Sequence, residues 1–328
     1  MTKVGVFGGS GFVGSNIASL LMKQNVSFHN FDILPSHLPI SQSEVDIETV
    51  GAHTDLLGCS VLINLAAMHR DDVRPLRRYT EVNVDGARNL CEAAKANNVT
   101  QIIFTSSVAI YGFAPANTGE DGAPNYFNEY GKTKYLAEQV YIDWQREDPK
   151  NRSLTIIRPT VIFGPGNRGN VYNLLKQIAS NRFVMFGDGQ NVKSMAYVEN
   201  VAGFAVHCLD AEPGVYTYNY VDKPDLNMSE LVSIAKGKLF GRRYAGVRLP
   251  AFLGVSIGWG FDLMAWLLGK RLPISSIRVK KFMATTQFSS AAMETGFKAP
   301  YTLAEGLEKT LGYEFLEDNR DKPTYETE

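Results

Sequence analysis

Hydrophobic residues along the first 160 positions follow two alternating patterns. Short runs that are almost entirely apolar predict strands buried on both faces, and the longer amphipathic stretches between them predict helices. Strand, helix and strand in repetition predict a doubly wound α/β fold, a parallel sheet with helices on both faces. The predicted strands are 3–7, 28–31, 61–64, 101–105 and 153–157, and the predicted helices are 11–24, about 72–97 and 130–148.

The pattern changes after Pro159. Turn-rich segments at 164–170 and 187–190 enclose a predicted helix over 171–180, and strand and helix patterns return at 192–210 and 215–220. From about Asp222 short helices and loops are expected, and the last dozen residues are expected to be frayed. We therefore predict a doubly wound domain over 1–165 and about 192–221, and a smaller C-terminal lobe over its carboxyl edge, formed by 166–191 and 222–328.

One apolar stretch, 249–269, is long enough to span a bilayer. Asp262 near its middle and three internal glycines argue against a spanning helix, so we favour a buried or partner-facing helical pair. Arg248 before the stretch and Lys270-Arg271 after it would suit a membrane surface. A peripheral membrane contact through 249–269 therefore stays open.

Composition narrows the function further. The chain has 33 basic and 34 acidic residues, a balance that predicts no nucleic-acid partner. Its three cysteines (Cys59, Cys91 and Cys208) are far apart and lack metal-ligand spacing, which predicts no metal site and suits a reducing compartment. Since no apolar run precedes the first glycines, a cytoplasmic location is expected.

Three glycines, Gly8, Gly11 and Gly14, stand where the first predicted strand passes into the first predicted helix. The first permits a tight turn, the second lets backbone approach a pyrophosphate, and the third lets helix pack close to strand. The helix N-terminus then offers unpaired N–H groups to the phosphates. Asp32, at the end of the second strand, can accept both ribose hydroxyls of NAD but would repel the 2′-phosphate of NADP. The sequence therefore predicts a Rossmann-type domain that binds NAD.

Further cofactor contacts are predicted beside these residues. Asp46 could reach the adenine, although a solvated loop acid is an equally good interpretation. The neighbours of the glycines and of the two acids complete this part of the predicted site: Phe12, Val13, Ile33 and Ile47.

A candidate catalytic group lies in the segment YGKTK, where Tyr130 and Lys134 are four residues apart and so share one face of a helix. A neighbouring ammonium favours the phenolate and so lowers the tyrosine pKa, which is about 10 in the free residue. Ser107 follows the strand 101–105 at the carboxyl edge, where its hydroxyl can hydrogen-bond a substrate oxygen. Ser106 is the weaker choice, because strand alternation turns its side chain the other way.

The order of these motifs resembles the extended short-chain dehydrogenase/reductase family, in its nucleotide-sugar epimerase/dehydratase branch. The matching segments run from Val4 to about Gly312 and include GGSGFVG, VLINLAA, EVNVDGARNL, TSSVAIYG, YGKTK, RPTVIFGPG and TLAEGL. The resemblance implies that Ser107, Tyr130 and Lys134 are the catalytic trio. It also implies that the cofactor cleft is lined by Leu65, Ala66, Ala67, Asn83 and Pro159.

In the family, three reactions share a first step, in which hydride leaves C4 of a sugar for NAD while the tyrosine takes the hydroxyl proton. Dehydratases resemble one another in an Asp-Glu pair after the catalytic hydroxyl residue, but Val108 and Ala109 stand here; the cysteine of 3,5-epimerase/reductases is also missing from this loop. A 4-epimerase of UDP-hexose or UDP-N-acetylhexosamine is the preferred prediction. An NAD(P)H-dependent 4-ketoreductase is the alternative, disfavoured by Asp32 because family reductases often take NADPH.

Substrate contacts follow from the resemblance less directly. Lys193 stands where relatives carry an arginine that contacts the substrate diphosphate, and a lysine can neutralise phosphate as a point charge. Arg278 is the predicted second phosphate contact, and His69 and Arg70 could touch substrate. The resemblance also implies a homodimer formed by the helices at about 72–97 and 130–148. Tyr135, Val140 and Tyr141 are candidate contacts, although burial against the chain's own sheet explains these residues equally well.

Two other functions stay open. A hydroxysteroid dehydrogenase of the same superfamily would share NAD, tyrosine and lysine, and the apolar stretch 249–269 would suit it. A catalytically silent NAD-sensing regulator would share the fold, but such proteins usually lack the tyrosine and lysine found here.

Overall fold

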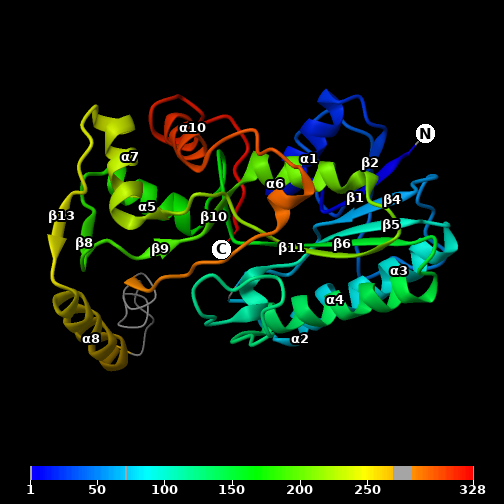
Figure 1. Ribbon diagram of the computed structural model, residues 1–328, viewed down its shortest axis with the longest axis horizontal. Coiled ribbons are helices and arrows are strands. Elements are labelled where there is room, and N and C mark those ends of the chain that lie inside the picture. The colour runs from blue at the N-terminus through cyan, green and yellow to red at the C-terminus, as the bar shows by residue number, and fades with distance from the viewer. Residues whose placement is uncertain (1, 71, 269–282, 328) are drawn as a thin grey trace.

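The computed structural model describes residues 2–70, 72–268 and 283–327. Its centre is a seven-stranded sheet of order β11-β6-β5-β4-β1-β2-β3, in which every neighbouring pair is parallel (Figure 1). The predicted doubly wound parallel fold is thereby confirmed. The strands are β1 Val4–Phe7, β2 Phe28–Asp32, β3 Gln42–Glu44, β4 Val61–Asn64, β5 Gln101–Thr105, β6 Ser153–Pro159 and β11 Gly214–Tyr220.

Helices cover both faces of this sheet (Figure 1). One face carries α1 (Phe12–Lys23) and α6 (Val198–His207), whose side chains share a buried cluster with β1, β4, β5 and β6. The other face carries α3 (Gly86–Ala96) and α4 (Glu129–Glu147). The central strands are mostly apolar, because a side chain on either face there meets a helix.

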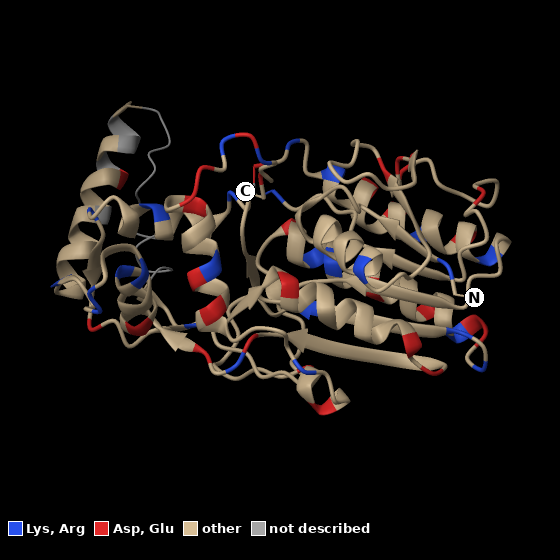
Figure 2. Ribbon diagram, turned by 90° about the horizontal axis from the view of Figure 1, so that it is seen from above, with Lys and Arg blue, Asp and Glu red and all other residues tan. Residues whose placement is uncertain are grey.

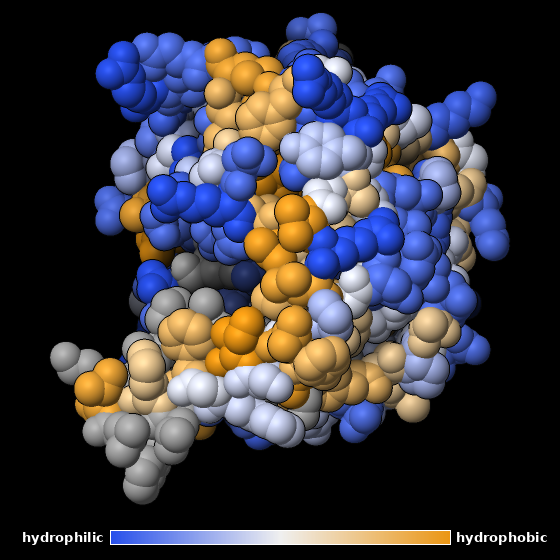
Figure 3. All heavy atoms as spheres, turned by 90° about the vertical axis from the view of Figure 1, so that its left-hand side faces the viewer, coloured by the Kyte–Doolittle hydropathy of each residue, from blue (hydrophilic) through white to orange (hydrophobic). Residues whose placement is uncertain are grey.

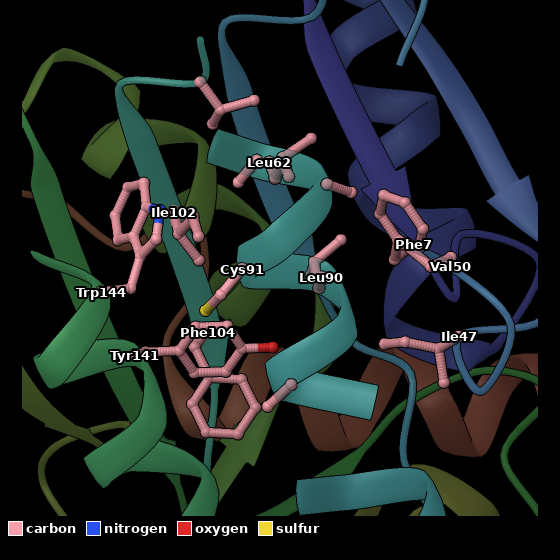
Figure 4. Close-up of a cluster of buried hydrophobic side chains, with 14 of the residues drawn as sticks. Phe7, Ile47, Val50, Leu62, Leu90, Cys91, Ile102, Phe104, Tyr141 and Trp144 are labelled. Carbon is pink, nitrogen blue, oxygen red and sulfur yellow. The ribbon is translucent and has the colours of Figure 1, made fainter. Parts of the chain in front are cut away.

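Helix α4 is held to the sheet by large aromatic side chains. Figure 4 shows Tyr141 and Trp144 pointing toward Ile102 and Phe104 of β5. The rings of Phe104 and Tyr141 are 4.7 Å apart between centroids, and both side chains are buried. Tyr141 therefore lies in the core of its own chain and is not available to a partner, contrary to the prediction that it could support a dimer.

The single helix predicted over about 72–97 is wrong in detail. A four-residue helix, α2 (Arg77–Thr80), is followed by a π-helical turn over Glu81–Asp85 and then by α3. The start is late because Pro75 cannot lie in a helix interior. The wider π-helical turn places the buried Asn83 toward the carboxyl edge of the sheet, where its side chain bonds the loop after β4.

The remaining elements pack beside the carboxyl edge (Figure 1). Side chains of α1, α5, α7 and α10 form one further buried cluster with the short strands β8 and β10. The short strands pair as β7 with β10, β8 with β13 and β9 with β12. Their bounds are β7 Val161–Phe163, β8 Val184–Phe186, β9 Val192–Lys193, β10 Met195–Tyr197, β12 Leu226–Asn227 and β13 Val247–Leu249, and the helices are α5 Asn170–Ala179, α7 Met228–Phe240, α8 Ala251–Leu268 and α10 Leu303–Phe315.

Two expectations for the C-terminal part are wrong. Long helices replace the expected short ones, and the stretch predicted as a helical pair forms one helix, α8, with exposed side chains. The expected frayed tail is anchored, because Tyr325 exchanges backbone hydrogen bonds with Gly166 and Arg168 and its hydroxyl bonds Ser15. Of the helices in the described ranges, none is long and apolar enough to cross a membrane.

A buried ion pair fixes α4 to β6. Arg158 donates to both carboxylate oxygens of Glu138, at 2.9 and 2.7 Å, and Glu138 is fully buried. The same guanidinium donates to the Tyr111 hydroxyl and to the Glu120 carbonyl oxygen. Removing one partner would leave the other charge buried and uncompensated.

Glu138→Ala is therefore expected to lower the free energy of unfolding by about 3–5 kcal/mol. The matched control is Glu147→Ala on the same helix, where the ion pair with Lys95 is about half exposed and the expected loss is below about 1 kcal/mol. Urea denaturation at equal NAD content measures both. Equal losses in the two variants would contradict the importance of the buried pair.

Candidate functional site

The register of the sheet aligns the predicted site residues along its carboxyl edge. Phe7 of β1 pairs with Phe31 and with Asn64, and Asn64 pairs with Phe104. The residues that follow these positions therefore emerge side by side, where ligands bind in sheets of this kind. They are Gly8, Asp32, Leu65 and Thr105.

Each glycine of the turn after β1 has its own constraint. Gly8 has φ +79°, and a Cβ there would lie 2.8 Å from the Ala66 nitrogen. A Cβ on Gly14 would lie 2.3 Å from the Gly8 oxygen, so helix and strand could not pack as closely. A Cβ on Gly11, in contrast, would contact protein atoms no closer than 3.4 Å. Packing therefore does not account for Gly11, and the open space there fits the close approach of a pyrophosphate.

Asp32 stabilises the glycine turn after β1 through hydrogen bonds and lies at the carboxyl edge of the sheet. Its two carboxylate oxygens accept hydrogen bonds from the backbone N–H groups of Ser10 (2.8 Å) and Leu34 (2.9 Å). Each carboxylate oxygen can accept a second bond, so both ribose hydroxyls of a dinucleotide can still be held. The negative charge beside them opposes a 2′-phosphate. Ile33, the next residue, is 58% exposed.

The two residues predicted after β3, Asp46 and Ile47, differ in exposure. Asp46 is exposed, and its carboxylate accepts the Glu48 N–H at 2.9 Å. Ile47 is buried in the core, where its side chain lies against Gly86. Its side chain is therefore not available to a ligand, and its carbonyl oxygen accepts a hydrogen bond from the Asn89 amide. Phe12 is buried in the cluster with α5, and Val13 is half-buried against it.

The loop after β4 is held in place by Asn83. Leu65, Ala66 and Ala67 are half-buried there. The Asn83 amide accepts the Met68 N–H at 2.8 Å, donates to the Met68 oxygen at 3.0 Å, and donates to the Thr133 hydroxyl at 2.9 Å. The side chain predicted to line the cofactor cleft thus ties this loop to α4.

Ser107 and Tyr130 come from two segments in direct contact. Ser107 caps the short helix Val108–Tyr111, and its hydroxyl accepts the Ala109 N–H at 3.1 Å. A Cβ on Gly131, the residue after Tyr130, would lie 2.5 Å from the Ala109 oxygen. Any larger residue at 131 would therefore push the two segments apart. Ser106 is buried, whereas Ser107 is partly exposed toward the edge.

Lys134 is held near Ser107 and Tyr130 by a hydrogen bond to the end of β5. It lies one turn along α4 from Tyr130, and its ammonium donates to the Thr105 carbonyl oxygen at 2.6 Å and lies 4.7 Å from the centre of the Phe104 ring. Burial lowers the pKa of Lys134 to about 7, while the Glu138 carboxylate acts in the opposite direction. A phenolate beside it would raise that pKa, so the two charges favour one another.

The predicted substrate contacts lie farther along the chain. Lys193 is in β9, and burial lowers its pKa to about 8. His69 and Arg70 follow the loop after β4. Desolvation by the surrounding protein, together with the charges of Lys134 and Arg70, lowers the pKa of His69, and its hydrogen bond with the Ala67 carbonyl acts in the opposite direction. Pro159 ends β6 at the same edge. Arg278 lies outside the described residues.

Three contributors escaped the sequence reasoning: Thr105, Gly131 and Glu138. The glycine inside YGKTK was a visible signal, because helix interiors disfavour glycine unless something packs against it. Thr105 acts through its backbone carbonyl, which no side-chain pattern reveals. Glu138 continues the i, i+4 series from Tyr130 and Lys134 and could have been suspected of facing the same way.

Comparison with known proteins identifies the family of this chain. The family model described as "NAD dependent epimerase/dehydratase family" matches residues 4–219. The chain is 46% identical over 327 residues to the N-acetyl-alpha-D-glucosaminyl-diphospho-ditrans,octacis-undecaprenol 4-epimerase of Escherichia coli O157:H7, covering 98% of each. It is 29% identical to the UDP-glucose 4-epimerase of Vibrio cholerae, covering 95% of each.

Solved structures share the fold. The UDP-glucuronic acid 4-epimerase of Bacillus cereus in complex with NAD matches with a TM-score of 0.72 at 19% identity, over 95% of this chain and 98% of the other. The predictions of the family, of the enzyme class and of NAD as cofactor are confirmed. The chain belongs to the NAD-dependent epimerase/dehydratase family.

Proposed function

We propose that this chain is an NAD-dependent 4-epimerase of an N-acetylhexosamine joined through a diphosphate to a polyprenol. The observation that carries the proposal is the 46% identity, over 98% of both chains, to a relative named for that activity. The 4-epimerase predicted from sequence is kept, and the name of this relative favours a lipid-linked sugar beside the predicted UDP-sugar, which the other relatives favour. The same chemistry at C4 serves both, because the reacting carbon is remote from the group that carries the diphosphate.

The site residues have defined roles in this proposal. The Tyr130 phenolate takes the proton from the C4 hydroxyl, and the adjacent Lys134 ammonium favours that phenolate. The Ser107 hydroxyl donates a hydrogen bond to the same sugar oxygen as it becomes a carbonyl. NAD, when bound, supplies a reversible hydride acceptor at C4. Turning the 4-keto sugar over before the return step would then invert C4.

The cofactor contacts are proposed as predicted from the sequence. The glycine turn and the N-terminus of α1 would hold the pyrophosphate, and Asp32 the ribose. In support, Gly11 is open to approach and both Asp32 oxygens keep acceptor capacity. Lys193 is proposed to neutralise the substrate diphosphate, and residues 166–191 and 222–328 to form the substrate lobe.

Assembly and location are part of the proposal. A homodimer through α3 and α4 is supported by the half-buried Tyr135 and Val140 and by the partly exposed Leu136. A cytoplasmic location is supported by the three cysteines, which are all free and buried. Since a polyprenol stays in its membrane, the enzyme must meet a bilayer surface, and peripheral contact through 249–269 is proposed.

A second candidate is 4-epimerisation of a UDP-sugar, favoured by the 29% identical relative. The deciding experiment offers purified protein polyprenyl-diphosphate N-acetylglucosamine and UDP-N-acetylglucosamine separately, with inversion at C4 followed by NMR. Higher kcat/KM for the lipid-linked sugar supports the first candidate. Turnover of the UDP-sugar alone would reject it. NAD released from denatured protein is expected for either epimerase, and an empty cleft would favour a reductase.

Tyr130→Phe is expected to lower kcat by about 10²-fold or more, because general-base catalysis contributes at least that much. NAD release on denaturation should stay unchanged, since the ring is preserved. The matched control is Tyr135→Phe, a half-buried tyrosine one turn away on the same helix, which should keep its rate. Unchanged turnover in Tyr130→Phe would reject the assigned role.

Asp32→Ala is expected to reduce the preference for NAD over NADP by about tenfold or more, because a carboxylate near a phosphate costs well over 1 kcal/mol in a partly buried site. Fluorescence titration of both cofactors measures the ratio of the two Kd values. Asp55→Ala, an exposed acid before β4 and outside the predicted site, is the control. A ratio that does not move in Asp32→Ala counts against the ribose contact.

Lys193 should impose a pH dependence on substrate capture. Its pKa is lowered to about 8, so its charge is present below that pH and is lost as the pH rises through it. Wild-type kcat/KM is therefore expected to fall above pH 8. Lys193→Arg stays charged and should lose this fall, whereas Lys193→Met should be about 10–100-fold lower at neutral pH. Identical pH profiles for wild type and Lys193→Arg would exclude Lys193 as the diphosphate contact.

A further inference from the structure

Helix α8 presents apolar side chains to solvent. Phe252 is 66% exposed, Trp259 60% and Leu268 59%, and Ile257 and Met264 are exposed by nearly half. From Phe252 onward, at about 100° per residue, the exposed residues that the structure describes cover about half of the circumference of the helix. These residues are uncharged: Phe252, Leu253, Ser256, Ile257, Trp259, Gly260, Met264 and Leu268.

The opposite side of α8 faces the protein. Gly254 is buried there, and a Cβ on it would lie 2.7 Å from the Phe186 ring of β8, so glycine allows the helix to pack closely. Val255 and Asp262 are half-buried and lie toward the same side. Asp262, the charged residue that argues against a spanning helix, therefore lies on the side opposite the apolar half.

Basic residues precede α8 in the chain. Between Glu230 and Asp262 the sequence has no acidic residue. Figure 2 shows α8 without charge along most of its length, and Figure 3 shows hydrophobic residues gathered in a column on this end of the molecule, with hydrophilic residues on both sides. The exposed apolar residues Phe240, Tyr244 and Val247 lead to α8, together with the exposed basic residues Lys238, Arg242, Arg243 and Arg248.

We propose that this end of the molecule, with α8 at its centre, docks on an anionic lipid bilayer. An apolar half of a helix accompanied by Lys and Arg is suited to lie in the plane of the interface, with its apolar side chains among the acyl chains. The basic residues are complementary to anionic head groups, and each adds to the attraction at low salt. The docking proposal depends on the proposed function in one respect: a lipid-linked substrate gives the enzyme a reason to bind a membrane.

The docking surface is connected to the proposed diphosphate contact. Phe186, on which α8 packs, is followed after a short turn by Lys193 in β9. Seven residues span at most about 25 Å when fully extended. An enzyme seated on α8 would thus keep Lys193 within reach of a diphosphate at the level of the lipid head groups.

The test is co-sedimentation of the full, NAD-loaded protein with vesicles of phosphatidylcholine and phosphatidylglycerol. Wild type is expected to pellet with the anionic vesicles, less with pure phosphatidylcholine, and less at high salt. Phe252→Ser/Trp259→Ser should bind the anionic vesicles at least tenfold more weakly. The matched control, Met22→Ser/Leu316→Ser, removes two exposed apolar residues from other surfaces and should bind like wild type.

A second measurement needs no disruptive variant. In a Trp266→Phe background, tryptophan fluorescence should be quenched by brominated lipids in anionic vesicles. Adding Trp259→Phe should remove most of that quenching, because the remaining Trp144 is buried in the core. Failure of the wild type to pellet, or equal binding by the two double variants, would overturn the proposal. The proposal would also be overturned if light scattering showed that the wild type forms a dimer through α8 and does not bind vesicles.

Docking and function can fail separately. Turnover of a short-chain, water-soluble diphosphate-linked N-acetylglucosamine reports the proposed function without a membrane. Turnover without vesicle binding would overturn docking and leave the function standing. Vesicle binding without turnover of any lipid-linked sugar would support docking and reject the function.

Discussion

The seating of α4 on one face of the sheet, with its N-terminus at the carboxyl edge, is the constraint on which the site depends. Lys134 is bonded to the carbonyl at the end of β5, Glu138 is paired with Arg158 of β6, and Tyr141 is packed on Phe104. These contacts follow one another at intervals of three or four residues along one face of the helix. Tyr130, at the start of the same face, is therefore positioned by the whole length of α4 rather than by its own loop.

Burial gives this arrangement its chemistry as well as its rigidity. An ammonium removed from water has a lowered pKa, and for Lys134 that brings proton exchange close to neutral pH. A charge of opposite sign placed beside it, such as a phenolate, is then stabilised more than it would be in water. The close contact at Gly131 sets the Ser107 segment beside this pair. The site thus combines a poised base with a hydroxyl donor at the edge where the glycine turn opens.

The carboxyl edge of the sheet and the end of the molecule formed by α8 present different surfaces. The glycine turn and Asp32 present backbone N–H groups and a carboxylate, which suit a charged dinucleotide. The α8 end presents a helix whose exposed half is apolar and whose neighbours are basic. A lipid-linked diphosphate sugar is divided in the same way, because its sugar and diphosphate are solvated by water and its polyprenol lies in the bilayer. The distribution of polar and apolar surface therefore matches the proposed substrate.

The sequence alone determined the features that depend on local pattern: five of the seven strands, the glycine turn, Asp32 at the end of β2, and the spacing of Tyr130 and Lys134. Each is encoded within a few residues, by side-chain periodicity or by turn chemistry. The tertiary structure alone decided the π-helical turn at Asn83, the anchoring of Tyr325, the burial of Tyr141 and Ile47, and the exposure of α8. These features depend on residues far away in the chain. A run of apolar residues has the same sequence pattern whether it is buried against a sheet or exposed to solvent, so the pattern alone does not decide between the two.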